Sequence, residues 1–469
     1  MAGKLDDLYI ACRLFASIAK RFTKPKRNFL AALPGFKRLA MVRNGHMISW
    51  LDFGPIHNRR WQQIQIVWSL SVCALLLVTW RLWVSQEIFP QVPLIGGVSF
   101  NLPILHWVTF ILLLVTASAF LVTRQLNGCQ RLVLRSFLVI AVLAVVLDQH
   151  RLQPWFYEAI LFALAMSCFS PMRAAAVLRA LLISIYLFSA LGKLDYQFLH
   201  TLGPQFVVAG FELVGISIAK WPTSLPVLLS VLFPIVELVG GVGLLSKRLR
   251  RMAIVLLVIM HVGLLLILGP LGLNHRSGVL LWNVSFIFQV ILLFGKQPSV
   301  NTSATAATIK TRQDSPRPVW ATYLFAILLL LPLVEPWGWL DHWLSWGLYS
   351  PRNSRVTLEI YQLPGQRLPS DMVPYVRSSR FREGMVELRM DEWSLAGLQV
   401  PIYPQARFQL GVAAAVIKEA NLQAFVITRQ SMSRRFSGER KEDTIKSLDQ
   451  LEEALKGFWV NARPNVRKK

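Results

Sequence analysis

The sequence predicts an all-α polytopic membrane bundle of about nine transmembrane helices, followed by a small soluble α+β domain at the C-terminus. Hydrophobic residues make up 54 % of the 469 residues and charged residues only 16 %. Several stretches are nearly free of charge and approach the roughly 20 helical residues that cross a hydrocarbon core. From about residue 337 onward, shorter and more polar segments replace these long apolar runs.

Nine segments are long and apolar enough to be transmembrane spans. They must be helical, because backbone amides that face lipid need hydrogen-bond partners within their own segment. The closely spaced segments between 132 and 191 have the least certain boundaries. The nine segments lie at about 64–84, 102–122, 132–148, 154–170, 173–191, 225–245, 252–269, 277–295 and 319–335.

The basic residues predict the orientation of these spans. The net charge is +25, but Lys and Arg gather in short blocks between apolar segments, which favours basic cytoplasmic loops over a nucleic-acid interface. The first 63 residues carry twelve Lys or Arg and 246–251 carries four, whereas 85–101 carries none. We therefore expect a cytoplasmic N-terminus, a lipid bilayer as partner and, after nine spans, an exoplasmic C-terminal domain. The inner membrane of a bacterium is the expected location.

The regions outside the main bundle have different compositions. Residues 5–21 read as a basic amphipathic helix on the membrane surface, since Arg13 interrupts the apolar run that a signal peptide would need. The four cysteines are far apart and are expected to be free thiols. The expected regions are a basic N-terminal region (1–63), an eight-span bundle (64–295), a cytoplasmic linker (296–318), a ninth span (319–335) and the exoplasmic domain (337–469).

The C-terminal domain is expected to mix strands and helix. Residues 355–363, 384–390 and 408–417 read as short strands, and 442–459 reads as an amphipathic helix. The domain holds no cysteine, so its core must stabilise it without disulfides. It has no nucleophile–base pair and no metal-ligand set, which favours a structural role or the binding of an extracytoplasmic protein.

Polar residues at membrane depth are the candidate site residues, because an ionisable group there costs several kcal/mol unless it is paired or hydrated. Nothing in their spacing predicts a metal. Those in or near the spans are Arg135, Glu158, Lys193, Asp195, Glu237, His261 and Asn283, and those at the span ends or in outer loops are His150, Asn274 and His275.

Lys193 and Glu158 allow two interpretations. They can form a structural ion pair between neighbouring helices, or the lysine can reach the interface. Alternatively, Lys193 is desolvated and acts as a base. His261 is likewise either a neutral, hydrogen-bonded core residue or a proton-transfer group.

Glu237 lies in the stretch PIVELVGGVGLLSKRLRRMA (234–253). Gly240 and Gly241 follow it at i+3 and i+4, where small residues let a second helix approach closely. A carboxyl group at such a contact is either protonated and hydrogen-bonded across the helices or paired with a cation. Its depth places Glu237 below the outer polar group, so we assign it, with Asp195 and Asn283, a structural role in the bundle.

Two stretches resemble a known family. YLFSALGKLDYQFLHTLGPQF (186–206) is similar to a signature of the HTTM domain, the membrane domain of vitamin K-dependent gamma-carboxylase and its bacterial relatives. Residues 234–251 resemble the Glu-x-x-Gly-Gly-x-x-Leu-Leu…Arg pattern of DoxX/MauE-type membrane proteins. The resemblance covers roughly residues 60–295. It implies that Lys193 matches the base that deprotonates the hydroquinone on the lumenal side.

The sequence also departs from that family. Gln149-His150 stands slightly earlier than the Asn-His of the carboxylase, and the cysteine pair that would support a MauE-type redox association is absent. The large lumenal domain that presents the carboxylase substrate has no counterpart, since about 130 residues are too few to supply it.

The leading hypothesis is a membrane-embedded enzyme or redox-associated protein that acts on a quinone-like, lipid-soluble molecule. Lys193 would serve as base or charge partner, supported by Glu158, His150 and His261. A second hypothesis is a non-catalytic anchor or assembly protein that works through residues 337–469. A third is a transporter, which intramembrane charge favours but which no inverted repeat supports.

Overall fold

The computed structural model describes residues 56–84, 88–97, 102–123, 129–218, 220–296, 319–361 and 368–465. They belong to one compact unit, Phe53–Lys469. The expected surface helix at 5–21, Cys12 and nearly all of the expected linker lie outside the described residues.

Eight of the nine expected spans form helices that are long and apolar enough to cross a membrane. The ninth, α6 (Pro154–Cys168), has 15 residues and a length of about 22 Å. The predicted fold class, a helical membrane bundle with a small α+β domain, is confirmed. The eight are α2 (Asn58–Val78), α4 (Pro103–Thr123), α5 (Cys129–Leu147), α7 (Pro171–Lys193), α10 with α11 (Ser224–Ser230, Leu232–Leu245), α12 (Arg250–Leu268), α13 (Ser277–Phe294) and α15 with η5 (Val319–Leu330, Leu331–Trp337).

The first span differs from its expected bounds. Helix α2 begins at Asn58, because polar residues extend a helix beyond the apolar part that hydropathy detects. It ends at Val78 and is capped by Thr79, whose hydroxyl donates to the Leu75 carbonyl, and the short α3 (Trp80–Val84) follows. The expected connection 192–224 also contains two short helices, α8 (Tyr196–His200) and α9 (Leu202–Glu212).

The glycines that follow Glu237 bring α11 close to two other helices. A Cβ atom on Gly241 would lie 3.0 Å from Tyr186 Cβ of α7. On the α12 side, a Cβ on Gly240 would lie 2.5 Å from Leu257 Cδ2, and one on Gly243 would lie 2.9 Å from Ala253 Cβ. The expected glycine packing face is therefore confirmed, and it serves two neighbours.

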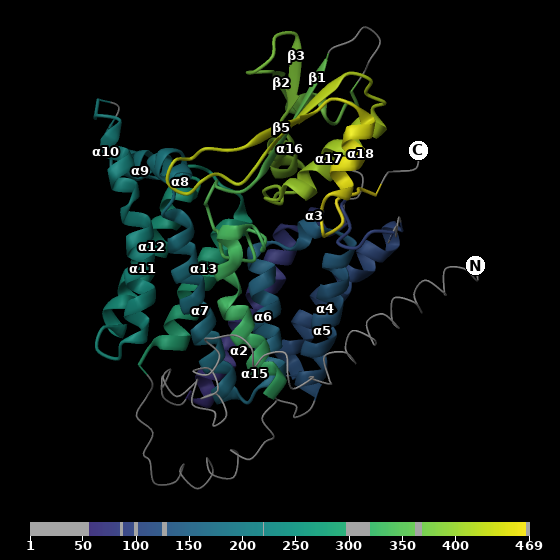
Figure 1. Cartoon of the computed structure of the whole chain (residues 1–469). Coiled ribbons are helices and arrows are strands. Elements are labelled where there is room, and N and C mark those ends of the chain that lie inside the picture. The colour runs from purple at the N-terminus through teal and green to yellow at the C-terminus, as the bar shows by residue number, and fades with distance from the viewer. Residues whose placement is uncertain are drawn as a thin grey trace, which may run out of the picture. The chain divides into compact units, whose positions relative to one another are not determined.

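The C-terminal region forms a five-stranded antiparallel sheet in the order β2-β3-β1-β4-β5. Figure 1 shows this sheet and helices α16–α18 at one end of the bundle, which we call the sheet-side end. One continuous cluster of buried apolar side chains includes residues of both the bundle and the sheet region. The elements are β1 (Arg355–Tyr361), β2 (Val376–Ser378), β3 (Met385–Leu388), β4 (Phe425–Gln430), β5 (Glu442–Ile445), α16 (Met390–Gly397), α17 (Ala406–Glu419), α18 (Leu448–Lys456) and two 3-10 turns, η4 (Gln149–Arg151) and η6 (Val373–Tyr375).

Two secondary-structure predictions for this region are wrong. Residues 408–417 form most of helix α17 instead of a strand. The segment is buried throughout and apolar except at Gln409, so it lacks the periodicity that separates helix from strand. Residues 442–445 form strand β5, and the expected helix starts only after Ser447, whose hydroxyl caps α18. The strands expected near 355–363 and 384–390 are confirmed as β1 and β3.

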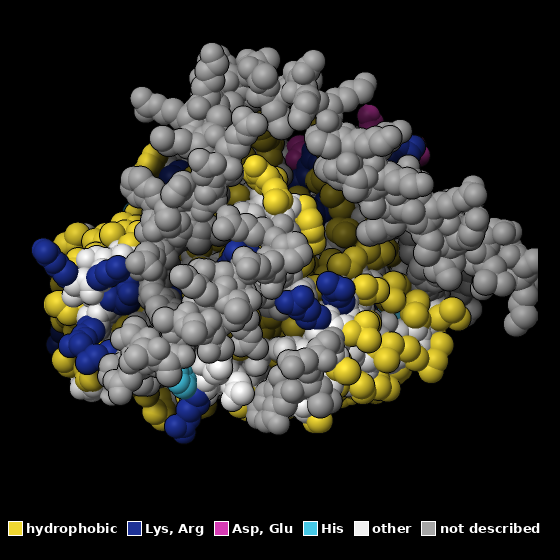
Figure 2. Space-filling view, turned by 90° about the horizontal axis from the view of Figure 1, so that it is seen from below, with side chains coloured by type: hydrophobic (Ala, Val, Ile, Leu, Met, Phe, Trp, Pro, Cys, Tyr) yellow, Lys and Arg dark blue, Asp and Glu magenta, His cyan; other side chains and the backbone are white. Residues whose placement is uncertain are grey.

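The opposite end of the bundle is basic. Figure 2 shows Lys and Arg side chains gathered on this face among hydrophobic ones. The connection from α11 to α12 alone contributes exposed Lys247, Arg248 and Arg251. We call this the basic end.

Candidate functional site: a polar cavity in the helix bundle

A cavity of about 50 Å³ lies between α7, α11, α12 and α13. Such a volume has room for a few water molecules. Tyr186, His261 and Asn283 line it and lie six or seven residues from the sheet-side ends of their helices, which places them about 10 Å below those ends. Leu348 and Tyr349, from the segment after η5, line the cavity as well.

Lys193 and Glu237 form a buried ion pair at this cavity. Lys193 Nζ lies 2.9 Å and 2.8 Å from the two carboxylate oxygens of Glu237 and donates to Ser189 Oγ at 2.6 Å. These three acceptors match the three protons of an ammonium group. The residues are only 4 % and 8 % exposed, so the charges rely on each other for compensation.

The direction of the lysine side chain explains this pairing. Helical side chains lean toward the N-terminus of their helix, so Lys193, the last residue of α7, turns back along its own helix to Ser189 at i−4. Its amine thereby reaches Glu237, on the second turn of α11. One sequence interpretation paired Lys193 with Glu158, which is wrong, because its partner is Glu237. Of the two states expected for Glu237, pairing with a cation is the one observed, although its depth had separated it from the outer polar group.

Tyr186, His261 and Asn283 form a hydrogen-bonded chain. Asn283 Nδ2 donates to the Val279 carbonyl at 2.9 Å, which turns Oδ1 toward His261 Nδ1, also at 2.9 Å. His261 Nδ1 must therefore carry a proton and Nε2 a lone pair. The Tyr186 hydroxyl lies 2.8 Å from Nε2 and donates to it. A hydroxyl, a base and a group that orients the base thus stand in one line.

Apolar rings surround this polar group. The His261 ring stacks on Phe286, with centroids 5.1 Å apart and planes at 8°. Phe198, Phe206 and Phe233 complete an aromatic wall on the cavity. The site therefore joins one polar region to an otherwise apolar lining, as small-molecule pockets commonly do.

Glu158 belongs to a neighbouring cavity of about 20 Å³ between α2, α6 and α13. It is 3 % exposed, and its Oε2 accepts a hydrogen bond from Trp282 Nε1. The Gln289 side chain also acts on this carboxyl group, and within the described ranges no Lys or Arg does. Trp282 lines both cavities and so lies between Glu158 and the Lys193 site.

His150 lies apart from both cavities, at the contact between the bundle and the sheet region. Its Nε2 is 3.0 Å from the Pro401 carbonyl, and its ring packs on Phe89 and Phe408. Burial lowers the pKa of His150 to about 4, so the ring is neutral near pH 7. The structure does not bring it together with Lys193 or His261.

The other candidates have local roles. Asp195 Oδ1 caps α8 through the Phe198 amide, and Oδ2 accepts from Ser350 Oγ at 2.8 Å. Asn274 is exposed in the turn between α12 and α13, where it has a φ of 49°. His275 is half-buried beside Tyr349, with ring centroids 6.1 Å apart. The exposed Arg135 is on α5 and does not line either cavity.

Sequence reasoning missed Tyr186, Ser189, Trp282 and Tyr349. Tyr186 and Ser189 were recoverable, because they precede Lys193 by seven and four residues and so share one helix face with it. Trp282 and Tyr349 carry no charge, and their sequence context does not mark them as site residues.

No family model, curated protein or solved structure matches the chain. The resemblance of residues 186–206 and 234–251 to HTTM and DoxX/MauE proteins therefore stays a prediction.

Proposed function

We propose that this multi-pass membrane protein is an enzyme that moves a proton to or from a lipid-soluble, hydroxyl-bearing molecule in the Lys193 cavity. One observation carries the proposal: the Tyr186–His261–Asn283 chain and the Lys193–Glu237 ion pair line the same buried cavity.

The geometry favours the tyrosine–histidine pair as the base. Lys193 has no free lone pair, because its amine is an ammonium with all three protons donated. Tyr186 Oη can give its proton to His261 Nε2 and take one from a ligand hydroxyl, leaving a ligand oxyanion and a histidinium whose Nδ1–H remains on Asn283. The Lys193 ammonium then stabilises the negative charge that forms on the ligand.

The cavity lining favours an aromatic ligand, such as a quinol. Phe198, Phe206, Phe233 and Phe286 offer ring surfaces beside the polar group. A cavity of about 150 Å³ holds benzene, so a quinol head group needs the 50 Å³ site to widen. The proposed HTTM/DoxX relationship supports the same ligand class, and the basic end in Figure 2 supports an exoplasmic position for the opposite end.

The full chain in lipid nanodiscs provides the test, with duroquinol as the probe. We expect duroquinol to raise the Tm and to be oxidised by dissolved oxygen faster than in empty nanodiscs, because the quinolate is oxidised more readily than the quinol. Tyr186→Phe should abolish the acceleration. Tyr323→Phe is the matched control, since Tyr323 is half exposed on α15 and does not line the cavity. Equal rates in wild type and Tyr186→Phe would refute the proposal.

The second candidate function is assembly with a partner protein through the C-terminal region. Exposed aromatic side chains favour it, since Phe381 and Phe436 are 72 % and 86 % exposed and Trp459 is completely exposed. Two results together would favour this alternative. The protein would neither bind nor oxidise the probe, and a partner protein would retain it only when these three aromatic side chains are present.

A further inference from the structure

Tyr349 lines the cavity, and its hydroxyl group has no protein partner among the described residues. Its Oη is buried and has no hydrogen-bond partner in the described part of the chain. Burial raises the pKa of Tyr349, so the group keeps its proton and remains a donor. A buried donor without an acceptor costs roughly 1–3 kcal/mol, which calls for an explanation.

Two fully buried tyrosines, Tyr186 at the cavity and Tyr403 in the sheet region, have a hydrogen-bond acceptor. Tyr186 Oη donates to His261 at 2.8 Å, and Tyr403 Oη donates to Asp341 Oδ2 at 2.6 Å. The Tyr349 ring packs edge-on against Phe206 with centroids 5.4 Å apart. A phenylalanine would satisfy this packing equally well, so packing does not explain the hydroxyl.

The backbone around Tyr349 is held in an unusual conformation. Tyr349 has a φ of 57° and Trp346 a φ of 59°, in the left-handed region that side chains other than glycine seldom adopt. Such strain persists only where the surroundings enforce it, and it gathers at ligand sites. In this backbone conformation Tyr349 lines the cavity.

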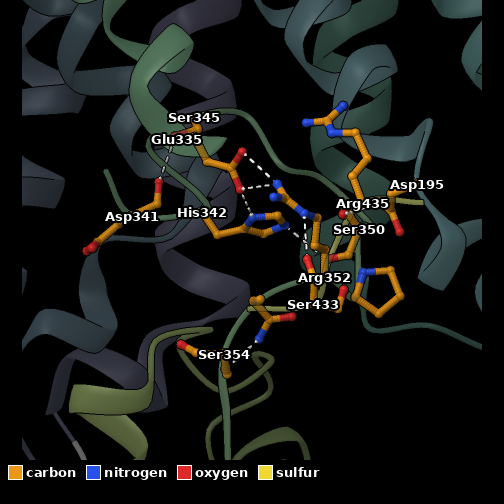
Figure 3. A network of polar contacts seen from close by, with 12 residues as sticks. Asp195, Glu335, Asp341, His342, Ser345, Ser350, Arg352, Ser354, Ser433 and Arg435 are labelled. Carbon is orange, nitrogen blue, oxygen red and sulfur yellow. Dashed lines mark hydrogen bonds and ion pairs between the residues drawn. The ribbon is translucent and has the colours of Figure 1, made fainter. Parts of the chain in front are cut away.

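A buried polar network lies directly beside Tyr349 in the chain (Figure 3). Glu335 accepts from Arg352 Nη1 at 3.1 Å and from His342 Nδ1 at 3.3 Å, and the other nitrogen of His342 lies 2.9 Å from the Ser350 carbonyl. The Ser350 hydroxyl reaches Asp195, two residues after Lys193. Both sides of the cavity are thus tied together immediately next to Tyr349.

We propose that Tyr349 is a ligand-contacting residue whose hydroxyl donates a hydrogen bond to an oxygen atom of the bound molecule. This inference rests on the proposed function and extends it: the ligand carries a second oxygen, apart from the hydroxyl that meets Tyr186. A carbonyl, ether or hydroxyl oxygen meets the requirement.

The test removes the hydroxyl from the protein and the second oxygen from the ligand. Duroquinol has two ring oxygens, and durenol is the corresponding phenol with one. Wild-type protein should bind duroquinol about tenfold more tightly than durenol, as the loss of one hydrogen bond implies. Tyr349→Phe should bind the two with equal affinity, whereas Tyr186→Phe should weaken both and keep the preference.

The stability of the ligand-free protein provides an independent readout. Tyr349→Phe should leave the Tm unchanged or raise it, because no hydrogen bond is lost. Tyr403→Phe, the matched control, should lower the Tm by about 2 °C because it leaves Asp341 short of a donor.

Three results would overturn the inference. In the first, Tyr349→Phe keeps the tenfold preference for duroquinol over durenol, while Tyr186→Phe weakens the binding of both. This result would leave the proposed function intact. Another is a Tyr349→Phe variant destabilised as much as Tyr403→Phe, which would show that the hydroxyl has a protein partner. Wild-type protein that binds neither probe would remove the proposed function and this inference together.

Discussion

Lys193 and Glu237 stabilise the folded protein only when both are present. Replacing one partner leaves a buried, uncompensated charge, which costs about 3–5 kcal/mol. Lys193→Met should therefore lower the free energy of unfolding by that amount, measured by chemical denaturation in detergent. The double variant Lys193→Met/Glu237→Leu should recover most of the loss, because an apolar pair of similar volume replaces both charges.

This coupling changes how Lys193 variants are interpreted. Loss of stability in Lys193→Met alone does not separate structure from chemistry, since the stranded Glu237 carboxylate causes it in either case. The double variant separates them, because it removes the ammonium without stranding a charge. A double variant as unstable as the single one would contradict the role of charge compensation.

The substitution of glutamine for glutamate should change stability in opposite ways at Glu158 and at Glu237. Glu158 has no cationic partner among the described residues, and the uncharged amide of Glu158→Gln can still interact with Gln289 and accept from Trp282. We expect the free energy of unfolding to stay level or to rise by about 1 kcal/mol. Glu237→Gln is the matched control and should destabilise, since it deprives Lys193 of its counter-charge. Equal losses in both variants would contradict this difference.

At the residue scale, sequence reasoning selected most of the polar group but not its pairing. Lys193, Glu237, His261 and Asn283 were recognisable because charged and amide groups stand out in apolar helices. The pairing failed because depth was counted along the backbone, whereas the lysine side chain runs back along its helix. The contact between Asn283 and His261 depends on how α12 and α13 face each other, which one sequence does not specify.

At the element scale, Gly241 sets the distance between α11 and α7, and with it the Lys193–Glu237 geometry. A Cβ atom there would press on Tyr186 Cβ at 3.0 Å, an atom that cannot move without its backbone. Gly241→Ala should therefore destabilise the protein by about 1–3 kcal/mol and weaken probe binding.

Gly263 in α12 is the matched control, since a Cβ atom there would meet nothing within 4 Å. Gly263→Ala should leave stability unchanged or raise it, because alanine favours the helix more than glycine does. Thermal unfolding in nanodiscs and titration with duroquinol measure both variants. Equal effects of the two substitutions would show that the stability change in Gly241→Ala comes from helix propensity rather than from close packing.

The elements themselves were predictable where a single physical signal dominates. Long apolar runs identified eight helices, because lipid leaves helix as the only option. The signal failed for α17, which is buried on all sides from Ala406 to Ile417 and so shows no clear apolar stripe. It also failed at the ends of α2, where polar residues continue the helix.

At the scale of the whole molecule, buried polar contacts join the bundle to the sheet region. Arg407 bridges Gln149 Oε1 and Asp341, and Gln149 Nε2 donates to the carbonyls of Pro93 and Asn461. These partners are separated by as many as 312 residues along the chain. Such contacts follow from the folded arrangement, so sequence reasoning left His150 as a site candidate when it is a residue of this contact.

Burial at this contact shifts the pKa values of Asp148 and His150 in opposite directions. Burial raises the pKa of Asp148 from 3.8 to about 6 and lowers the pKa of His150 from 6.5 to about 4. The stability from Asp148 is present at low pH and lost as the pH rises toward 6. The stability from His150 is present above pH 6.5 and lost as the pH falls toward 4. Between pH 4 and 6 the folded state holds two neutral groups and the unfolded state a carboxylate and an imidazolium, so the two contributions nearly cancel.

Single variants should reveal two opposite slopes of the free energy of unfolding against pH. In Asp148→Asn only His150 remains, so the free energy of unfolding should fall, relative to wild type, as the pH drops from 6.5 to 4. In His150→Gln only Asp148 remains, so it should fall as the pH rises from 4 to 6. The difference from wild type at each pH removes contributions from other groups, including the nearby Arg151 charge that acts on both residues. Denaturation in detergent at stepped pH measures the slopes, and slopes of the same sign would contradict the opposed pKa shifts.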